Sequence, residues 1–231
     1  MASPKWQALS RYTACDIADA LLKLGVPGAG YLPRIVRSTR VAPEKVIAPA
    51  STFLMAPKAT PSFPSSTPLP DNFPKSNLAD AGPYADHTEP NTIVVISQPK
   101  GQDCAVVGGI MAARMKQLGA LGVLVDGQIR DLEDLGKTGL HVWSRGTSII
   151  GAGAQTKFHA KNVPIQVENT IVEPGDIIMM DPAENGAVAI PKGKLDEILE
   201  LLPKIVAADE KVLEDVKQGV PVAEAFKRHR S

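Results

Sequence analysis

Cysteine is scarce in this chain, and aromatic residues make up only 4% of it. The two cysteines, Cys15 and Cys104, do not have the spacing of zinc ligands, and nothing before them resembles a secretory signal. The sequence therefore favours a reduced, cytoplasmic protein. Cys104 lies close to a pair of glycines, where a reactive thiol is conceivable, but a small buried side chain is the favoured interpretation.

Net charge and long apolar runs are also lacking. The 25 basic and 25 acidic side chains cancel, so no positive field favours nucleic acid or an anionic membrane as the main partner. No apolar run approaches the length of a membrane span. The four histidines form no HxH or HExxH pair, which argues against a zinc site. At 231 residues, one well-buried α/β domain is favoured over two small ones.

The most informative stretch runs from Val106 to Asp131. It begins with the glycine pair Gly108-Gly109, where the backbone can turn sharply and approach a ligand closely. A short helix is expected next, ending at Gly119. Its apolar face is defined by residues at helical spacing, which are Met111, Met115 and Leu118.

The second half of this stretch predicts a strand and a turn. Leu121 to Val125 is a continuous apolar run of strand length, and Asp126-Gly127 is expected to turn the chain. Arg130 and Asp131 follow just beyond, and Leu132 to Leu135 predicts a helical turn.

These elements suit the binding of a small α-keto acid. Free N–H groups at a helix start bind an anion, and an arginine matches a carboxylate with two parallel hydrogen bonds. An aspartate beside the arginine can hold Mg²⁺, which needs few protein ligands and would act as a Lewis acid on the carbonyl oxygen. On the pattern alone, a solvated Arg130-Asp131 dipeptide in a loop stays open as the commoner case.

The first 90 residues predict a helix, a strand and an irregular insertion. Thr13 to Leu24 has the apolar spacing of an amphipathic helix, whose N-terminus Thr13 or Asp16 can cap. Its acids, Asp16 and Asp19, are expected on its solvated side. Residues 56–90 contain eight prolines, which exclude a long helix or a central strand. We expect a flap or a subunit contact there, with a short helical stretch around 77–81 and His87 as a surface histidine.

The remaining elements are predicted from alternation and helical spacing. Gly146 to Gly153 is a glycine-rich loop, but it does not connect a strand to a helix as a phosphate-binding loop does. From Lys194 onward the chain is predicted to be helical, and Pro203 is expected to bend this helix or divide it. The predicted strands outside the central stretch are Val46–Met55, Asn91–Gln98, His141–Arg145, Val163–Val172, Asp176–Met180 and Ala187–Ile190.

Four motifs together resemble one known family. They are G-G-I-M-A-A-R-M-K-Q-L-G from Gly108, V-D-G-Q-I-R-D from Val125, V-W-S-R-G from Val142 and V-E-P-G-D-I-I-M-M-D from Val172. They are similar to the family that contains the 4-hydroxy-4-methyl-2-oxoglutarate aldolases and the regulator of ribonuclease activity A. The Gly-Gly form of the first motif is most similar to the fungal branch. The resemblance covers most of the chain except the proline-rich insertion.

The resemblance implies an α/β fold, a swivelling β/β/α-like sandwich. Residues 1–231 would form one such domain, with the insertion at about 56–90 and C-terminal helices from about 194. It implies a homotrimer or a hexamer with the site at a subunit boundary. It also implies retro-aldol cleavage or oxaloacetate decarboxylation, each of which leaves a pyruvate enolate stabilised by a divalent cation, Mg²⁺ or Mn²⁺.

The resemblance also assigns roles to residues. Gly108, Gly109, Ile110 and Met111 would bind the keto-acid carboxylate through backbone N–H groups, while Arg130 pairs with substrate oxygens and Asp131 holds the metal directly. In many active members an acid follows the first glycine of this loop and orients a metal-bound water. Here that position is Gly109, which puts proton delivery in question. A second carboxylate would come from a neighbour's C-terminal helix, with Asp209 and Glu210 as candidates.

Two alternatives to the lyase stay open. One is a non-catalytic oligomeric protein that acts through its surface, as the ribonuclease regulator does. The other is a secondary-metabolic enzyme that has reused the site, with the proline-rich insertion reshaping its entrance. Retention of Arg130 and Asp131 favours an enzyme, whereas Gly109 favours the non-catalytic alternative.

Overall fold

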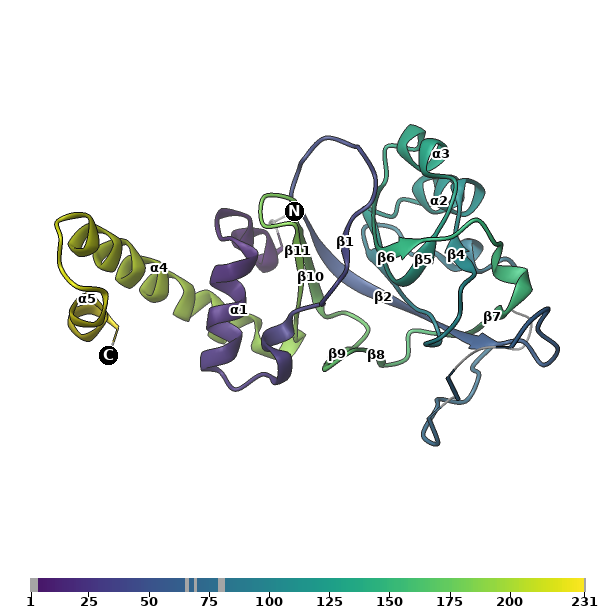
Figure 1. Cartoon of the computed structure of the whole chain (residues 1–231), viewed down its shortest axis with the longest axis horizontal. Coiled ribbons are helices and arrows are strands. Elements are labelled where there is room, and N and C mark those ends of the chain that lie inside the picture. The colour runs from purple at the N-terminus through teal and green to yellow at the C-terminus, as the bar shows by residue number, and fades with distance from the viewer. Residues whose placement is uncertain (1–3, 65–66, 69, 79–81, 231) are drawn as a thin grey trace.

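The computed structural model describes residues 4–64, 67–68, 70–78 and 82–230. Its centre is a nine-stranded sheet in the order β1-β6-β5-β3-β2-β10-β11, with β4 paired to β5 and β7 paired to β2 (Figure 1). The strands are β1 (Val36–Arg37), β2 (Val46–Pro57), β3 (Ile93–Ser97), β4 (Ala105–Val107), β5 (Gly122–Ile129), β6 (His141–Thr147), β7 (Thr156–Lys161), β10 (Ile177–Asp181) and β11 (Gly186–Ile190).

Helices cover this sheet, so the fold is mixed α/β, as the sequence predicts. A short separate hairpin consists of β8 (Ile165–Val167) and β9 (Thr170–Val172). The α-helices are α1 (Ala14–Lys23), α2 (Gly109–Gln117), α3 (Leu132–Lys137), α4 (Leu195–Lys217) and α5 (Val222–His229). The 3-10 helices are η1 (Lys5–Arg11), η2 (Pro27–Gly30), η3 (Tyr84–His87), η4 (Ala152–Ala154) and η5 (Lys192–Lys194).

The parallel strands β2, β3, β5 and β6 form the middle of the sheet. They are apolar on both faces because both faces are covered, as is usual for parallel strands. On one face α2 and α3 bury a cluster that includes Val94, Val123 and Met115. On the other face Leu124 and Trp143 belong to a second cluster, which the β8–β9 hairpin completes. This arrangement leaves the carboxyl ends of β5 and β6 free to carry a site.

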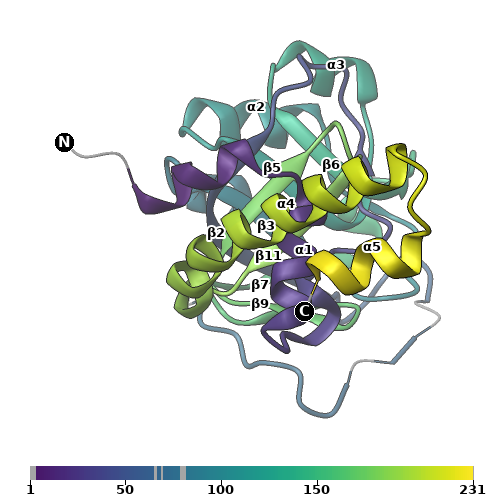
Figure 2. The same cartoon turned by 90° about the vertical axis from the view of Figure 1, so that its left-hand side faces the viewer.

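The antiparallel strands β10 and β11 carry the other helices. Here α1 and α4 bury a third cluster that includes Met179, Leu21 and Ile198. Figure 2 shows α1, α4 and α5 together on one side of the molecule. In Figure 1 they lie at the end opposite α2 and α3. In the described part of the chain no helix is long and apolar enough to cross a membrane.

Several local predictions are confirmed. The first helix begins with a capping box, in which Thr13 Oγ1 accepts the Asp16 N–H and the Asp16 carboxylate accepts the Thr13 N–H. Asp16 is therefore a structural cap. Gly119 ends α2 with a φ of +91°, a conformation that glycine adopts without steric cost.

The predicted turn at Asp126-Gly127 is wrong, because both residues lie inside β5. A Cβ on Gly127 would come within 2.1 Å of Gln98 Oε1, so the glycine makes room for a neighbouring side chain. Asp126 is buried and ion-paired with Arg145. Burial raises the pKa of the Asp126 carboxyl, and the charge of Arg145 opposes that rise.

The predicted strand Val163–Val172 is two strands, because the chain reverses between β8 and β9. Glu168 adopts a φ of +53° at this reversal. Its carboxylate is held by cations from outside the hairpin, Arg34, Lys100 and Arg145. These ion pairs fix the tip of the hairpin against the body of the protein.

Pro203 does not divide the C-terminal helix, because α4 continues through it. Ile198, Leu202 and Ile205 on either side are buried against the third cluster. This packing offsets the backbone hydrogen bond that a proline cannot make. The chain instead turns at Gly219, whose φ is +91°, before α5.

The described part of the proline-rich segment is irregular, as predicted, apart from one 3-10 turn near its end. Of the stretch 77–81, residues 79–81 lie outside the described residues, and Asn77 is not helical. The Asn77 amide instead pairs with the backbone of Lys161, at 2.7 and 3.0 Å. The turn is η3, and His87 within it is not a plain surface residue, because its ring lies 5.2 Å from that of Phe158.

Candidate functional site

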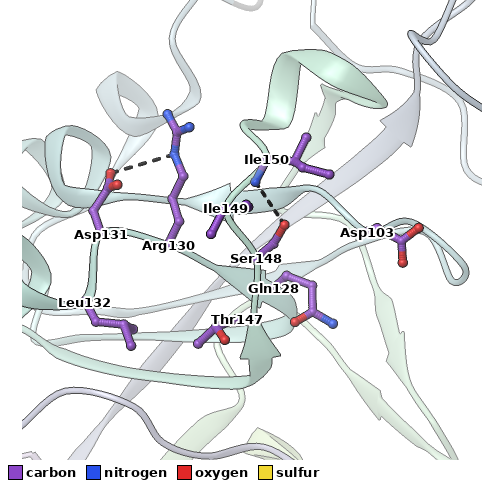
Figure 3. Close-up of a pocket in the computed structure, with 9 residues that line it drawn as sticks. All are labelled: Asp103, Gln128, Arg130, Asp131, Leu132, Thr147, Ser148, Ile149 and Ile150. Carbon is purple, nitrogen blue, oxygen red and sulfur yellow. Dashed lines mark hydrogen bonds and ion pairs between the residues drawn. The ribbon is translucent and has the colours of Figure 1, made fainter.

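A cavity of about 560 Å³ lies where β5 and β6 end (Figure 3). In α/β sheets, ligands bind at the carboxyl ends of parallel strands, and this volume suits a small molecule. The cavity is lined by Asp103, Gln128, Arg130, Asp131, Leu132, Thr147, Ser148, Ile149 and Ile150.

Arg130 is held at this edge by its backbone and by two glycines. Its N–H donates to Val107 O at 2.9 Å, which places it directly after β5 and beside β4. A Cβ on Gly108 would lie 2.6 Å from Asp131 Oδ2 and 3.3 Å from both Cγ and Nε of Arg130. A Cβ on Gly151 would lie 3.0 Å from Arg130 Nη1. The arginine side chain thus passes close to two glycines, and neither position leaves room for a Cβ without a shift of a neighbouring side chain.

Asp131 turns the chain into α3. It is the N-cap of that helix and adopts the left-handed conformation, with φ 59° and ψ 47°. Aspartate is one of the few residues other than glycine that tolerate this region. Its Oδ2 accepts the Gly109 N–H at 3.1 Å and lies 3.7 Å from Arg130 Nε. The carboxylate is therefore oriented between the glycine loop and the arginine.

The glycine loop lies beside the Arg-Asp pair. The helical ladder of α2 begins with the Ala112 N–H donating to Gly108 O, so the N–H groups of Ile110 and Met111 have no acceptor within the helix. The Gly109 N–H is taken by Asp131. The residues Gly108 to Met111 do not line the cavity itself.

The position of Gly109 is crowded by α3. A Cβ there would lie 2.8 Å from the Cβ of Asp134 and 3.7 Å from that of Asp131. The Asp134 carboxylate is exposed and pairs with Lys137 at 3.1 Å. An acid at position 109 would therefore need space that Asp134 occupies.

Asp131 is the carboxylate beside Arg130 that could serve as a ligand for a divalent cation at this site. Among the described residues, no group of three or more His, Cys, Asp or Glu side chains is arranged to hold a metal. Mg²⁺ keeps several waters and is commonly bound through one or two carboxylates, so one half-exposed aspartate is compatible with it. Asp209 and Glu210 lie on α4, at the far end of the molecule from α3 (Figure 1), and Asp209 pairs with Arg230 at 2.5 Å.

Sequence reasoning did not single out Tyr84, Gly151 or Asp103. Tyr84, from the proline-rich segment, lies behind the site and donates a hydrogen bond to Val106 O. Burial raises the pKa of its hydroxyl, and the charge of Arg130 opposes that rise. Gly151 belongs to a glycine-rich loop that gave no specific signal.

Cys104 is fully buried, and burial raises the pKa of its thiol, which favours the small buried side chain expected from the sequence.

Comparisons with known proteins agree with the motifs. Residues 14–188 match the model of the RraA-like family, described as Aldolase/RraA. A "Putative 4-hydroxy-4-methyl-2-oxoglutarate aldolase" from Halalkalibacterium halodurans is 33% identical over 135 residues, which are 58% of this chain and 62% of that protein. Protein DlpA from Legionella pneumophila is 24% identical over 221 residues, which are 95% of this chain and 32% of DlpA. The chain thus spans about a third of DlpA and about three fifths of the other relative.

Solved structures show the same fold. An uncharacterised protein from Pseudomonas syringae has a TM-score of 0.76 at 21% identity, covering 99% of this chain and 95% of that one. Streptomyces coelicolor RraAS2, described as an unusual member of the RNase ES inhibitor RraA family, has a TM-score of 0.69 at 22% identity, covering 92% and 95%. The family match over residues 14–188 identifies this α/β chain as a member of the RraA-like, Aldolase/RraA family.

Proposed function

We propose that this chain is a divalent-metal-dependent C–C lyase acting on pyruvate-type 2-oxo acids. Its reactions would be retro-aldol cleavage of 4-hydroxy-4-methyl-2-oxoglutarate or related compounds, decarboxylation of oxaloacetate, or both. The observation that carries the proposal is the Arg130–Asp131 pair, oriented by glycine contacts at the edge of a cavity. Membership of a family with a named aldolase relative supports it.

The chemistry assigned to the chain's own residues is electrostatic. The Arg130 guanidinium would pair with the substrate and stabilise the negative charge that develops on the 2-oxo oxygen. In retro-aldol cleavage the C3–C4 bond breaks and its electron pair stays on C3. The 4-hydroxyl loses its proton as C4 becomes a carbonyl, and C3 takes a proton to give pyruvate. Asp131 would hold Mg²⁺ or Mn²⁺, which supplies a Lewis acid for the same charge.

The N–H groups of Ile110 and Met111 would add anion-binding donors at the start of α2. Gly108 and Gly109 would contribute indirectly in this geometry. Gly108 leaves room first for the Asp131 carboxylate and then for Arg130, and the Gly109 N–H orients Asp131. These four residues are therefore proposed to support the site, with Arg130 and Asp131 as the groups that contact substrate and metal.

Assembly as a homotrimer or hexamer belongs to the same proposal. Large apolar side chains are exposed near the site, with Ile149 95% and Ile110 79% exposed. Neighbouring copies would cover such side chains and could bring the α4 acids Asp209 or Glu210 to the site, which one copy alone does not do.

A non-catalytic binding protein is the second candidate. The observation in its favour is Gly109, which carries no acid and faces a space filled by Asp134. Similarity to RraAS2, which is described as an unusual member of the RNase ES inhibitor RraA family, is compatible with this alternative. That the chain does not take nucleic acid as its main partner stays a prediction from its balanced charge.

Measuring pyruvate release separates the two candidates. The purified chain is assayed with 4-hydroxy-4-methyl-2-oxoglutarate and with oxaloacetate, in Mg²⁺ and after chelation. We expect release that chelation abolishes and that Mg²⁺ restores, and Arg130→Lys should lower it because lysine lacks the planar fork. Trapping of a pyruvate adduct on a lysine by borohydride would contradict the metal mechanism. Absence of release from both substrates would favour the binding protein.

A further inference from the structure

Gln155 is a completely buried side chain, and its amide links two other segments of the chain. Its exposed fraction is 0%. Its Oε1 accepts the N–H groups of Asp103 and Cys104, at 2.8 and 3.1 Å. Its Nε2 donates to Pro64 O in the proline-rich segment, at 3.2 Å. One amide thus connects the proline-rich segment to the residues that precede β4.

The residues that precede β4 form part of the cavity. The chain is irregular between β3 and β4, and Asp103 in this stretch lines the cavity (Figure 3). Cys104, which follows, is fully buried. A buried backbone N–H without an acceptor is costly, and here the acceptor is the Gln155 side chain. Gln155 therefore holds one wall of the cavity from behind.

A second buried glutamine extends this connection to the arginine. Gln98, 5% exposed, donates through Nε2 to Cys104 O at 2.7 Å. Its Oε1 accepts the Gln128 N–H at 2.9 Å. Gln128 lines the cavity and lies two residues before Arg130 on the chain. A continuous series of hydrogen bonds and peptide groups therefore runs from Pro64 to the carboxyl end of β5.

The proline-rich segment is also attached to the loop that leads into Gln155. The Lys58 N–H donates to Gln155 O at 2.9 Å, and the Lys58 ammonium donates to Gly153 O at 2.7 Å. The Ser62 N–H donates to Ala154 O at 2.7 Å. These contacts lie toward the outside of the molecule, whereas the Gln155 side chain is buried. Gln155 thus carries the attachment inward to the cavity.

We propose that Gln155 is a positioning residue of the site, which transmits the placement of the proline-rich segment to the cavity wall at Asp103 and to the end of β5. The inference rests on the proposed function for the class of ligand, a 2-oxo acid or an analogue held beside Arg130. Gln155 does not line the cavity and takes no part in bond cleavage. Its role is to keep the wall and the arginine in their relative positions.

Gln155→Glu tests the contact with Pro64 by itself. The side chain keeps its size, and in either ionisation state it can accept the N–H groups of Asp103 and Cys104. Only the protonated acid can donate to Pro64 O. Burial should raise the pKa of the introduced acid, and the Asp103 carboxylate should add to that rise, whereas the Lys58 ammonium should oppose it. The contact should therefore be present at acidic pH and lost as the pH rises.

The readout is oxalate affinity, measured by calorimetry in Mg²⁺ and expressed relative to the wild type at each pH. We expect Gln155→Glu to bind within about twofold of the wild type at about pH 5.5 and about tenfold more weakly at about pH 8.5, the effect of one lost hydrogen bond in a buried place. Gln166→Glu is the matched control, because it adds the same charge at an exposed position on β8. It should follow the wild type at every pH.

Gln155→Met removes every hydrogen bond of the side chain at similar size. We expect oxalate affinity to fall by more than about tenfold. Thr39→Val is the control for lost stability alone. The buried Thr39 hydroxyl donates to Leu140 O at 3.1 Å and accepts the Val142 N–H at 3.0 Å, at the amino end of β6 and away from the cavity. Thr39→Val should lower the urea midpoint but leave oxalate affinity unchanged.

Three results would overturn the inference. They are a Gln155→Glu variant that follows the wild type at every pH, a Gln155→Met variant that binds oxalate as tightly as the wild type, and an affinity that falls only with the folded fraction seen by circular dichroism. If Gln155→Met does not fold, Gln155→Glu decides, since its protonated form keeps every hydrogen bond.

The pyruvate assay decides the proposed function separately. Oxalate binding without pyruvate release from either substrate would refute the lyase, and the Gln155 variants would still support or overturn the inference. Failure of the wild type to bind oxalate in Mg²⁺ would overturn both.

Discussion

The carboxylate of Asp131 accepts a hydrogen bond from the backbone N–H of Gly109, at 3.1 Å. This contact joins two segments that are separate in sequence, the start of α2 and the end of β5. It holds the Asp131 carboxylate against the start of α2 while the residue keeps a left-handed backbone conformation. The aspartate therefore has a structural role as well as the proposed role of metal ligand, and variants must separate the two.

Asp131→Asn is expected to separate them. Asparagine tolerates the left-handed region, and its amide oxygen can still accept the Gly109 N–H. Stability to urea should stay close to wild type. The affinity for Mn²⁺, measured by calorimetry, should fall by more than about tenfold, because a neutral oxygen replaces the carboxylate.

Asp131→Ala serves as the comparison. It loses the hydrogen bond as well and places alanine at a φ of 59°, so it should cost about 2 kcal/mol of stability. If Asp131→Asn binds Mn²⁺ as tightly as the wild type does, Asp131 is not the metal ligand.

Gly151→Ala is expected to weaken substrate binding without weakening the fold. Gly151 has a φ of −74°, which alanine adopts readily, so the substitution adds only a methyl group 3.0 Å from Arg130 Nη1. The guanidinium must give way by a few tenths of an ångström, so kcat/KM should fall by up to about tenfold. Oxalate affinity should fall as well.

Gly153→Ala is the matched control for this variant. It lies in the same loop, and a Cβ there would meet nothing within 4 Å. Its kinetics should match the wild type. If the Gly151 and Gly153 variants behave alike, contact with Arg130 is not what Gly151 provides.

The sequence indicates the candidate residues and the local structure better where the signal is local than where tertiary packing decides the conformation. Arg130 and Asp131 stand out because they follow an apolar run, and the capping box of α1 is visible in its residues. Gly127 looked like part of a turn, yet it lies in β5 because the Gln98 side chain needs its space. Gly151 carried no signal, since its role depends on the Arg130 side chain reaching it from another strand.

Two elements in the C-terminal half of the chain were also mispredicted because tertiary contacts decide their conformation. Pro203 is a helix breaker by propensity, but burial of neighbouring apolar residues keeps α4 continuous. The reversal at Glu168 was missed because cations distant in sequence stabilise it. In each case a tertiary contact overrode a correct local preference.

The pH dependence of stability should include a contribution from His141. Burial lowers the pKa of this imidazole below its ordinary value of 6.5, and Glu44 partly opposes the shift. The unfolded state therefore binds the proton more readily, so stability falls as the pH drops below about 6.5. His141→Gln should lose less stability than the wild type between about pH 7.5 and about pH 5.5 in urea unfolding. An identical loss in both proteins would remove His141 as a contributor.

Assembly is testable without any substrate. We expect light scattering at micromolar concentration to give the mass of a trimer or hexamer. Exposed apolar side chains on the C-terminal helices, Leu213, Val222 and Phe226, are consistent with further burial between copies. A monomer would contradict both the assembly and the proposal that a neighbour completes the site.

The consequences of restoring an acid at position 109 depend on Asp134. Gly109 is not among the residues with positive φ, so a side chain there meets no backbone strain. The obstacle is the Asp134 Cβ, 2.8 Å from the position that a Cβ would occupy. Gly109→Asp alone should therefore push α3 away, which would lower both stability and oxalate affinity.

Combining Gly109→Asp with Asp134→Gly should relieve that clash. The glycine added to α3 should lower the free energy of unfolding by about 1 kcal/mol. The single variant Asp134→Gly is the control that measures this cost. With the loop intact, a carboxylate near the reacting carbon can order a water for general-acid catalysis, an effect of about 10²–10⁴-fold. We expect the double variant to recover oxalate affinity and to exceed Asp134→Gly in turnover of oxaloacetate. Recovered affinity without faster turnover would show that proton delivery does not limit the reaction.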